Sequence, residues 1–238
     1  MNLSRNGARE VRARLAALAS PAKAEGAARF FKTGKRQYAE GDVFLGVTVP
    51  QQRAIARAHR ALSHPDLSRL LRSEIHEERL TALLILVAQY ESGDDARKET
   101  CVAFYLAHLP HINNWDLVDS SAAPILGAHL LTRDRAILRR LARSKTLWER
   151  RVAIVATHAF LRAGETKDAI AIAEALLGDE HDLIHKAVGW TLRELGKRAD
   201  LAALRRFLDE HGARMPRTAL RYAIERLPLD ERKRRLAR

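Results

Sequence analysis

The amino-acid sequence predicts an all-α protein, an α-solenoid built of two-helix repeats. Apolar residues, mostly Ala, Leu and Ile, recur at i, i+3, i+4 and i+7 along almost every segment, which is the periodicity of helices that bury one face. The alternation of Val, Thr and aromatic residues that strands favour is scarce. The 238 residues include only 7 prolines and 12 glycines, so helices and short turns dominate the prediction.

Short breaks separate the predicted helices, and each break contains a residue that caps, breaks or turns a helix. They fall at Pro21, Gly34, Pro50, Pro65, Gly93, Pro110, Asp134, Ser144, Gly164, Gly178, Gly212 and Pro228. Loops this short place consecutive helices side by side, so the helices from about residue 75 onward are predicted to pair. The pairs are 77–90 with 97–108, 115–130 with 134–142, 147–162 with 167–177 and 183–195 with 201–211, and a last helix covers 216–226.

The three tryptophans mark successive pairs. Trp115, Trp148 and Trp190 are spaced 33 and 42 residues apart, close to the roughly 40-residue period of two-helix solenoid repeats. Equivalent helices of a solenoid line one concave surface. Trp115 and Trp190 have polar and basic helix neighbours and are expected in such a basic groove, whereas Trp148 is expected in the core.

The net charge of the chain limits the classes of molecule that it is expected to bind. Lys and Arg number 42 against 29 Asp and Glu, a formal net charge of +13, which favours a polyanion such as DNA, RNA or an anionic membrane surface. The single cysteine, Cys101, forms no intrachain disulfide and is interpreted as a small core residue. The N-terminal residues lack the apolar stretch of a signal peptide, so a cytoplasmic or nucleoid-associated protein is expected.

The domain prediction is one continuous domain over residues 1–238, because no Gly/Ser/Pro-rich linker interrupts the chain. Its basic end, residues 228–238, is interpreted as a solvated helix end that adds nonspecific affinity for DNA.

Trp115 and Asp119 form the most informative pair in the sequence. Four residues apart in a predicted helix, they share one helix face. A carboxylate beside an indole, in a protein rich in positive charge, suits a cationic sugar or base held next to a phosphate backbone. Taken alone, Asp119 has two structural alternatives, which are a helix cap and an ion pair with an arginine.

No metal or nucleotide cofactor is predicted. His181 and His185 have the i, i+4 spacing of metal ligands, but no third ligand lies near them in the sequence. His76 begins a His-Glu segment that lacks the second histidine of a zinc-protease motif. Glycine-rich phosphate loops of the GxxxxGK[ST] or GxGxxG type do not occur.

Several motifs, in order along nearly the whole chain, resemble the AlkD-type DNA alkylation-repair glycosylases. The motifs are Pro21-Ala22-Lys23-Ala24, Ala28-Arg29-Phe30, Phe44-Leu45-Gly46-Val47, Trp115-Asp116-Leu117-Val118-Asp119-Ser120, Leu147-Trp148-Glu149-Arg150-Arg151-Val152-Ala153-Ile154 and Lys186-Ala187-Val188-Gly189-Trp190-Thr191-Leu192-Arg193-Glu194. The resemblance implies a solenoid of HEAT-like helical repeats with a basic concave groove. It also implies hydrolysis of the N-glycosidic bond of cationic N3- or N7-alkylated purines in duplex DNA without a base-binding pocket. A monomer is the default expectation for a solenoid that engages one duplex.

The resemblance also assigns roles to residues. Asp119 matches the family's catalytic aspartate, Trp115 and Trp190 its groove tryptophans, and Arg151 its groove arginine. Phe30 stands where the family tends to have a tyrosine, so stacking remains without the hydroxyl. Asn114 stands where a second aromatic residue often precedes the tryptophan. Both departures bear on substrate preference.

The chemistry of such a site follows from charge. A purine alkylated at N3 or N7 leaves as a neutral base, so protonation by a general acid is not required. Positive charge develops on the deoxyribose instead, and a preplaced Asp119 carboxylate would stabilise it and orient the attacking water. Indole faces attract cations, which suits Trp115 and Trp190. Arg151 would contact a phosphate beside the lesion.

Lys186 is the lysine of the last motif, and it is interpreted as a phosphate contact or a solvated side chain rather than a Schiff-base nucleophile. The sequence therefore favours a monofunctional glycosylase. The alternative is a noncatalytic helical-repeat scaffold that binds nucleic acid or an acidic protein, with Asp119 structural. Both hypotheses predict salt-sensitive DNA binding, so only release of a modified base separates them.

Overall fold

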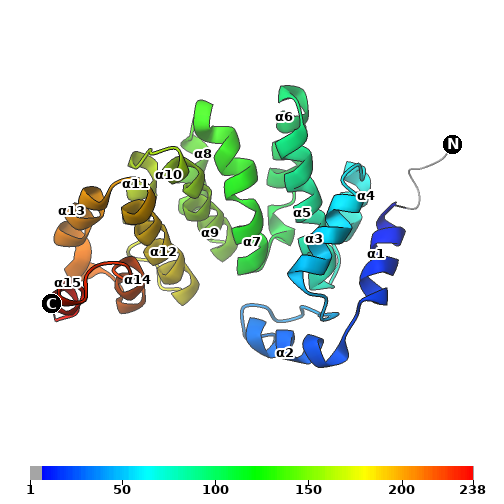
Figure 1. Ribbon diagram of the computed structural model, residues 1–238, viewed down its shortest axis with the longest axis horizontal. Coiled ribbons are helices and arrows are strands. Elements are labelled where there is room, and N and C mark those ends of the chain that lie inside the picture. The colour runs from blue at the N-terminus through cyan, green and yellow to red at the C-terminus, as the bar shows by residue number, and fades with distance from the viewer. Residues whose placement is uncertain (1–6, 238) are drawn as a thin grey trace. The chain divides into compact units, whose positions relative to one another are not determined.

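The computed structural model describes residues 7–237, and the chain divides into two compact units at Ser121 and Ala122. Each unit consists of helices joined mostly by short turns, apart from the longer segment 32–48 between α2 and α3 (Figure 1). Within the described residues, strand-like pairing is limited to one isolated parallel bridge between Val43 and Ile75. The all-α helical-repeat prediction is therefore confirmed. The predicted 1–238 domain also includes residues 1–6 and 238, which lie outside the described part.

The first unit is centred on one long helix, α5 (His76–Ser92). Its neighbours are α1 (Gly7–Ala17), α2 (Pro21–Phe31), α3 (Val49–Ala58), α4 (His64–Leu71), α6 (Asp95–Ala107), the 3-10 turn η1 (Leu109–His111) and α7 (Trp115–Ser121). Helices α1, α3, α4, α6 and α7 pack directly against α5. Because α5 is covered on several sides, nearly all of its side chains from His76 to Leu86 are buried.

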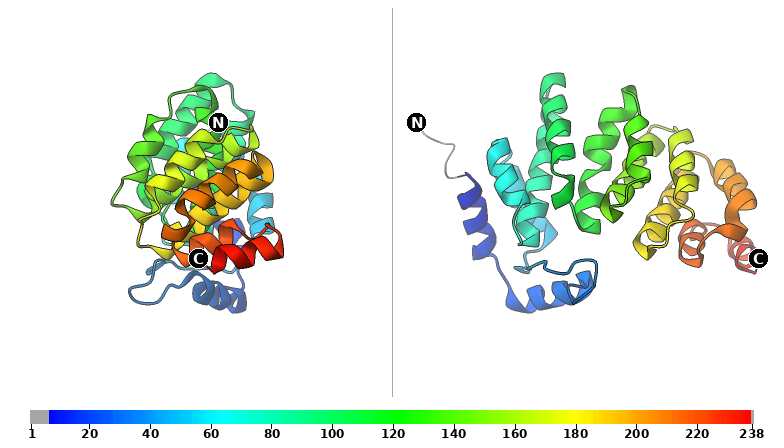
Figure 2. Two further views of the ribbon diagram at one scale, coloured as in Figure 1. Left: turned by 90° about the vertical axis from the view of Figure 1, so that its left-hand side faces the viewer. Right: turned by 180° about the vertical axis from the view of Figure 1, so that it is seen from behind.

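The second unit is centred on α12 (Asp182–Arg198), which packs against α9, α10, α11, α13 and α14 (Figure 2). Its elements in order are the π-helical turn η2 (Ala123–Gly127), the 3-10 turn η3 (Leu130–Thr132), α8 (Ala136–Ala142), α9 (Leu147–Ala156), α10 (His158–Arg162), α11 (Lys167–Ala175), α12, α13 (Leu201–His211), η4 (Gly212–Arg214), α14 (Arg217–Ala223) and α15 (Leu229–Leu236). Within this unit α9 and α10 pack on α11, and α12 packs on α13, as predicted, whereas α8 packs mainly on α9.

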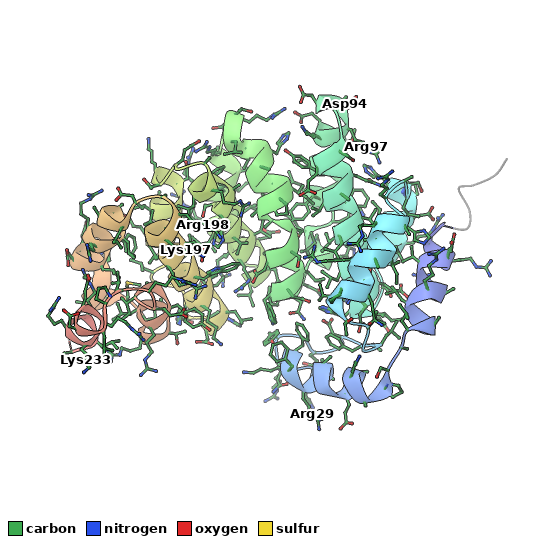
Figure 3. All side chains as sticks on the ribbon, viewed as in Figure 1. Arg29, Asp94, Arg97, Lys197, Arg198 and Lys233 are labelled. Atoms are coloured by element: carbon green, nitrogen blue, oxygen red, sulfur yellow. The ribbon has the colours of Figure 1, made fainter. Side chains whose placement is uncertain are left out.

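Side-chain caps fix several helix starts. Asp94 Oδ1 accepts a hydrogen bond from the Arg97 backbone N–H at 2.8 Å at the beginning of α6 (Figure 3). Asp200 does the same for α13, accepting from the Ala203 N–H at 2.9 Å. Each cap satisfies a backbone donor that has no partner within the helix. Helix α6 therefore begins just after the predicted break at Gly93, and α13 covers the predicted helix 201–211.

Two predicted helices are wrong as single continuous helices. The 115–130 segment is α7 followed by the π-helical turn, in which the Gly127 N–H donates to the Ala122 carbonyl at 2.9 Å. A Cβ at Gly127 would lie 2.1 Å from the Ala156 carbonyl oxygen, so the irregular turn and the glycine together permit close packing on α9. The 147–162 segment breaks at Thr157, whose hydroxyl donates to the Ile154 carbonyl at 2.6 Å and competes with regular helical bonding.

The core predictions are confirmed at two positions. Cys101 is fully buried, and Trp148 is 9% exposed.

The interpretation of the C-terminal run as a solvated helix end is wrong for part of α15. Glu231 is buried and accepts hydrogen bonds from Arg205 and Arg235, and Arg235 also pairs with Asp209 at 2.9 Å. Ion pairing thus holds α15 on α13, while Lys233 and Arg234 remain exposed.

The described helices are too short or too polar for a bilayer span. None of those within residues 7–237 combines the length and apolar character needed to cross a membrane.

Candidate functional site

The first turn of α7 is held by hydrogen bonds to buried polar groups. Asn114, which is fully buried, accepts a hydrogen bond from the Trp115 backbone N–H at 2.8 Å through its own side-chain oxygen. Its amide nitrogen donates to Asp42 Oδ2 at 3.1 Å. The indole N–H of Trp115 donates to the Tyr38 hydroxyl at 3.2 Å. These contacts fix both the helix start and the orientation of the Trp115 ring.

A stack of aromatic rings lies against Trp115. Phe31 stacks on the indole with ring centroids 5.2 Å apart, and Phe44 stacks on Phe31 at 5.0 Å. His76 continues the stack at 4.6 Å from Phe44. Phe30, which is 65% exposed, meets Trp115 edge-on at 5.9 Å. The structure therefore brings the predicted site residues Phe30 and Trp115 together.

His76 also connects two carboxylates. Its Nδ1 lies 3.1 Å from Asp42 Oδ2, and its Nε2 lies 2.8 Å from Asp116 Oδ2. Arg79 donates to Asp42 Oδ1 at 2.7 Å. Burial works to lower the pKa of His76, but the hydrogen bonds to Asp116 and Asp42 outweigh it and raise the pKa to about 9. Burial likewise opposes ionisation of Asp42, yet His76 and Arg79 hold the pKa of Asp42 below its usual value.

A cavity of about 210 Å³ lies beside this cluster within the first unit. Phe31, Phe44, His76 and Asp116 form part of its wall, and Lys23 lies among its lining residues. The Glu77 carboxylate on the same wall accepts hydrogen bonds from the backbone N–H groups of residues 45–47 at 2.8–3.3 Å. This bonding ties the segment before α3 to α5, so the aromatic wall has a fixed backbone behind it.

Asp119 lies on α7, one turn beyond Trp115, and is partly exposed. Side chains four residues apart in a helix share a face, as the sequence predicts. Burial raises the pKa of Tyr105, and the Asp119 carboxylate raises it further. The Tyr105 hydroxyl forms a 3.1 Å hydrogen bond with the Ser121 hydroxyl at the end of α7. The Asp119 carboxylate therefore lies near Tyr105 and the buried end of α7.

The second unit contains the other three predicted site residues. Arg151, on α9, is 4% exposed, and its guanidinium donates to the Leu183 carbonyl at 2.6 Å, at the start of α12. It is therefore a buried, oriented arginine rather than a solvated one. Lys186, on α12, forms an ion pair with Asp182 at 2.8 Å and keeps 39% of its side chain exposed.

Trp190 lies one turn further along α12 and is half-buried. The ring of His158 meets the indole edge-on at 4.3 Å, and its Nε2 lies 2.9 Å from the Thr191 hydroxyl. Burial lowers the pKa of His158 to about 4, so a neutral imidazole supports Trp190 at neutral pH. The structure thus holds Trp190 from behind and leaves part of the indole accessible.

The two histidines with metal-ligand spacing have local hydrogen-bond roles. His181 Nδ1 accepts from the Leu183 N–H at 3.1 Å and caps α12, and His185 Nε2 lies 2.5 Å from the Asp179 carbonyl. Across residues 7–237, no group of three or more His, Cys, Asp or Glu side chains is arranged to hold a metal ion.

Sequence reasoning missed the residues that support Trp115 and Trp190. Phe31 follows Phe30 directly, and the angle of 100° between consecutive helix residues gives the two rings different faces. Nothing in the sequence relates Asp42 to Asn114, because the two are 72 residues apart and meet only in the fold. His158 carries no sequence signal either, since a lone histidine in an apolar run resembles any core histidine.

The geometry defines a class of protein: an all-α helical-repeat protein with a carboxylate and supported aromatic residues on its helices. Among solved structures, a predicted DNA alkylation repair enzyme from Enterococcus faecalis has a similar fold, with a TM-score of 0.71 at 18% sequence identity over 89% of this chain and 97% of that chain. No curated protein matches the sequence. The family model described as DNA alkylation repair enzyme matches residues 11–227. The chain belongs to that family, which confirms the expected membership and supports a role in alkylation repair.

Proposed function

We propose that this protein is a monofunctional DNA glycosylase that hydrolyses the N-glycosidic bond of cationic N3- or N7-alkylated purines in duplex DNA. The observation that carries the proposal is the placement of Asp119 one turn from Trp115 on α7, in a chain of the DNA alkylation repair enzyme family. The first turn of that helix is fixed by Asn114 and by the Phe31 stack. A rigid support is what a preorganised charge requires.

Asp119 is the proposed catalytic residue. As the bond between C1′ and the purine nitrogen breaks, its electrons go to the base, which leaves neutral, and positive charge develops on the deoxyribose. The Asp119 carboxylate stabilises that charge and orients a water molecule toward C1′, and it accepts a proton from that water. The products are the free alkylated base and an abasic site in intact DNA.

The remaining site residues hold the DNA. Phe30 and Trp115 offer a partly exposed aromatic pair in the first unit, and Trp190 offers an indole in the second. Aromatic faces attract the cationic nucleoside and exclude water from it. Lys186, with 39% of its side chain exposed and its ammonium paired with Asp182, is the proposed phosphate contact, whereas Arg151 is buried and its guanidinium donates to the Leu183 carbonyl. Phosphate contacts of this kind set register without reading sequence.

The net charge of +13 supports a polyanionic substrate. Duplex DNA that carries alkylated purines is the proposed partner, bound by a monomer in the cytoplasm or at the nucleoid. Affinity is expected to fall steeply with salt, because each neutralised phosphate releases counterions.

Base release from defined DNA tests the proposal. Purified protein is incubated with duplex DNA that contains N7-methylguanine or N3-methyladenine, and free base is measured over time at matched DNA occupancy. Asp119→Asn is expected to slow release by about 10²–10³-fold while binding persists. Asp95→Asn, an exposed aspartate on α6, is the matched control and should release base at the wild-type rate.

A noncatalytic scaffold predicts a different result. The wild-type protein would bind the same DNA and release no base above the spontaneous rate. That outcome would overturn the glycosylase proposal and leave a helical-repeat module that binds nucleic acid by charge and shape.

A further inference from the structure

We propose that His76 is a positioning residue that holds the first turn of α7, and through it Trp115 and Asp119, in the geometry that base release requires. This inference rests on the proposed glycosylase function. It assigns a role to a buried histidine that touches neither the DNA nor the reacting atoms.

The contacts of His76 lead directly to α7. Its Nε2 lies 2.8 Å from the carboxylate of Asp116, the second residue of that helix. Its Nδ1 lies 3.1 Å from Asp42, which also accepts a hydrogen bond from Asn114 at 3.1 Å. Asn114 in turn accepts from the Trp115 N–H. One imidazole therefore connects α5 to both sides of the start of α7.

The charges around His76 come from three elements. Asp116 lies on α7, Asp42 lies in the segment between α2 and α3, and Arg79 lies one turn along α5. Lys23 of α2 and Glu77 of α5 line the adjoining cavity, and Glu77 is bonded to backbone N–H groups. Two carboxylates thus face one imidazole, with Arg79 paired to Asp42 alone.

Both ring nitrogens must carry a proton for this arrangement. Each carboxylate accepts one N–H, and a neutral imidazole has only one N–H to donate. Asp116 depends on His76 most, because its Oδ1 is buried without a hydrogen-bond partner. A neutral imidazole would leave one of the two carboxylates without its N–H, and loss of the His76 side chain would remove the hydrogen bond that the structure shows for the Asp116 carboxylate. An unpaired buried carboxylate is costly, so the first turn of α7 would move toward solvent.

Movement of the first turn of α7 would also displace Asp119, the proposed catalytic residue, because it belongs to the same helix. Asp119 is three residues beyond Asp116, so a shift or tilt of the first turn displaces both Asp119 and the stacked Trp115. A misplacement of about 1 Å that originates away from the chemistry can lower a rate on the order of 10²-fold. Affinity for undamaged duplex DNA, which rests mainly on phosphate contacts, should change little.

Single-turnover base release and DNA affinity, measured on the full-length protein, test the inference together. His76→Gln is expected to slow release by roughly 10–100-fold and to leave the dissociation constant for undamaged duplex DNA within about twofold, because it disturbs the lesion site and not the phosphate contacts. His64→Gln is the control, since His64 is a half-buried histidine of the same unit whose ring lies 4.7 Å from that of Phe104 on α6.

Two further measurements separate positioning from a general loss of folding. Asp116→Asn removes the same contact from the other side, so the double variant should be no slower than either single variant. The wild-type rate, divided by that of the matched His76→Gln protein, should fall as pH rises past about 9. The same ratio for His64→Gln should stay flat.

Either of two results would overturn the inference. One is base release by His76→Gln at the wild-type rate, and the other is that the effects of the two single variants multiply in the double variant.

If the wild-type protein releases no base at all, the proposed function fails first. The positioning role is then decided by Trp115 fluorescence in a Trp148→Phe, Trp190→Phe background. A shift between pH 7 and pH 10 that disappears with His76→Gln supports a clamp on α7, and its absence rejects one.

Discussion

The ring of Phe31 stacks on the indole of Trp115, with centroids 5.2 Å apart and planes 19° from parallel. One indole face is therefore occupied by the protein itself. Phe30, the neighbouring residue on α2, meets the same indole edge-on and remains largely exposed. Adjacent phenylalanines thus have separate tasks, since Phe31 supports Trp115 while Phe30 is available to a ligand.

Truncation of Phe31 should mainly lower stability, and truncation of Phe30 should mainly weaken DNA binding. Phe31→Ala removes a half-buried ring from the stack and should lower the free energy of unfolding by about 2 kcal/mol, less than a fully buried ring costs. Phe30→Ala should leave stability within about 0.5 kcal/mol but weaken binding to alkylated DNA, where stacking on a base contributes about 1–3 kcal/mol. Urea unfolding and DNA titration measure the two effects. Equal losses of stability in both variants would contradict this division of roles.

The stability of the protein should fall as pH rises from about 6.5 to about 9, because of His76. The folded protein holds the His76 proton up to about pH 9, and the unfolded chain releases it near 6.5. The native state therefore binds more protons in that window, and stability decreases with rising pH. A difference of this size corresponds to about 3 kcal/mol. Urea unfolding at pH 6 and pH 9.5 measures it.

The His76→Gln variant provides the control for that measurement. It should be less stable than the wild type at pH 6 and should lose the alkaline dependence. A wild-type unfolding free energy that stays constant from pH 6.5 to 9 would show that the imidazole is neutral in the folded protein.

His158 should make the free energy of unfolding depend on pH in the opposite direction, at acidic pH. Burial keeps its imidazole neutral down to about pH 4, whereas the unfolded chain takes up a proton near 6.5. The unfolded state therefore binds more protons in that window, and stability falls by about 3 kcal/mol as pH drops from about 6.5 to 4. His158→Gln keeps a polar partner for Thr191 and should flatten the loss. If the variant and the wild type lose stability in parallel, His158 is not its source.

The helical architecture was predictable because it depends on periodicity and on breaks. Apolar spacing and residues such as Pro21 and Asp94 are local signals, and local signals set where a helix begins and which face it buries. The interruptions at 122–127 and at Thr157 were not predictable. The first accompanies close packing on α9, as the 2.1 Å approach implied for a Cβ at Gly127 illustrates, and the second accompanies the bond from the Thr157 hydroxyl to the Ile154 carbonyl.

The site was predictable only where one helix carries two of its residues. Trp115 and Asp119 share α7, so their spacing alone relates them. The Asp42–His76–Asp116 cluster joins three segments that are 34 and 40 residues apart, and such contacts exist only after folding. Burial of Arg151 belongs to the same category, because its partner is the carbonyl of Leu183, 32 residues away.

Gly189 should be the glycine of α12 least tolerant of substitution. A Cβ there would lie 2.4 Å from the Ala219 carbonyl oxygen and 2.6 Å from the Tyr222 Cβ, so α12 and α14 pack with their backbones nearly in contact (Figure 1). Backbone cannot move aside as a flexible side chain does. Gly189→Ala is therefore expected to cost about 1–3 kcal/mol through overpacking, despite the better helix propensity of alanine.

The same substitution should also affect Trp190, the next residue on α12. Separation of α12 from α14 would alter its contact with His158, so its fluorescence should shift as thermal stability falls. Gly178→Ala is the matched control, because a Cβ at Gly178 meets nothing within 4 Å. A Gly189→Ala protein as stable as the control would mean that α14 lies further from α12 than the Ala219 contact requires.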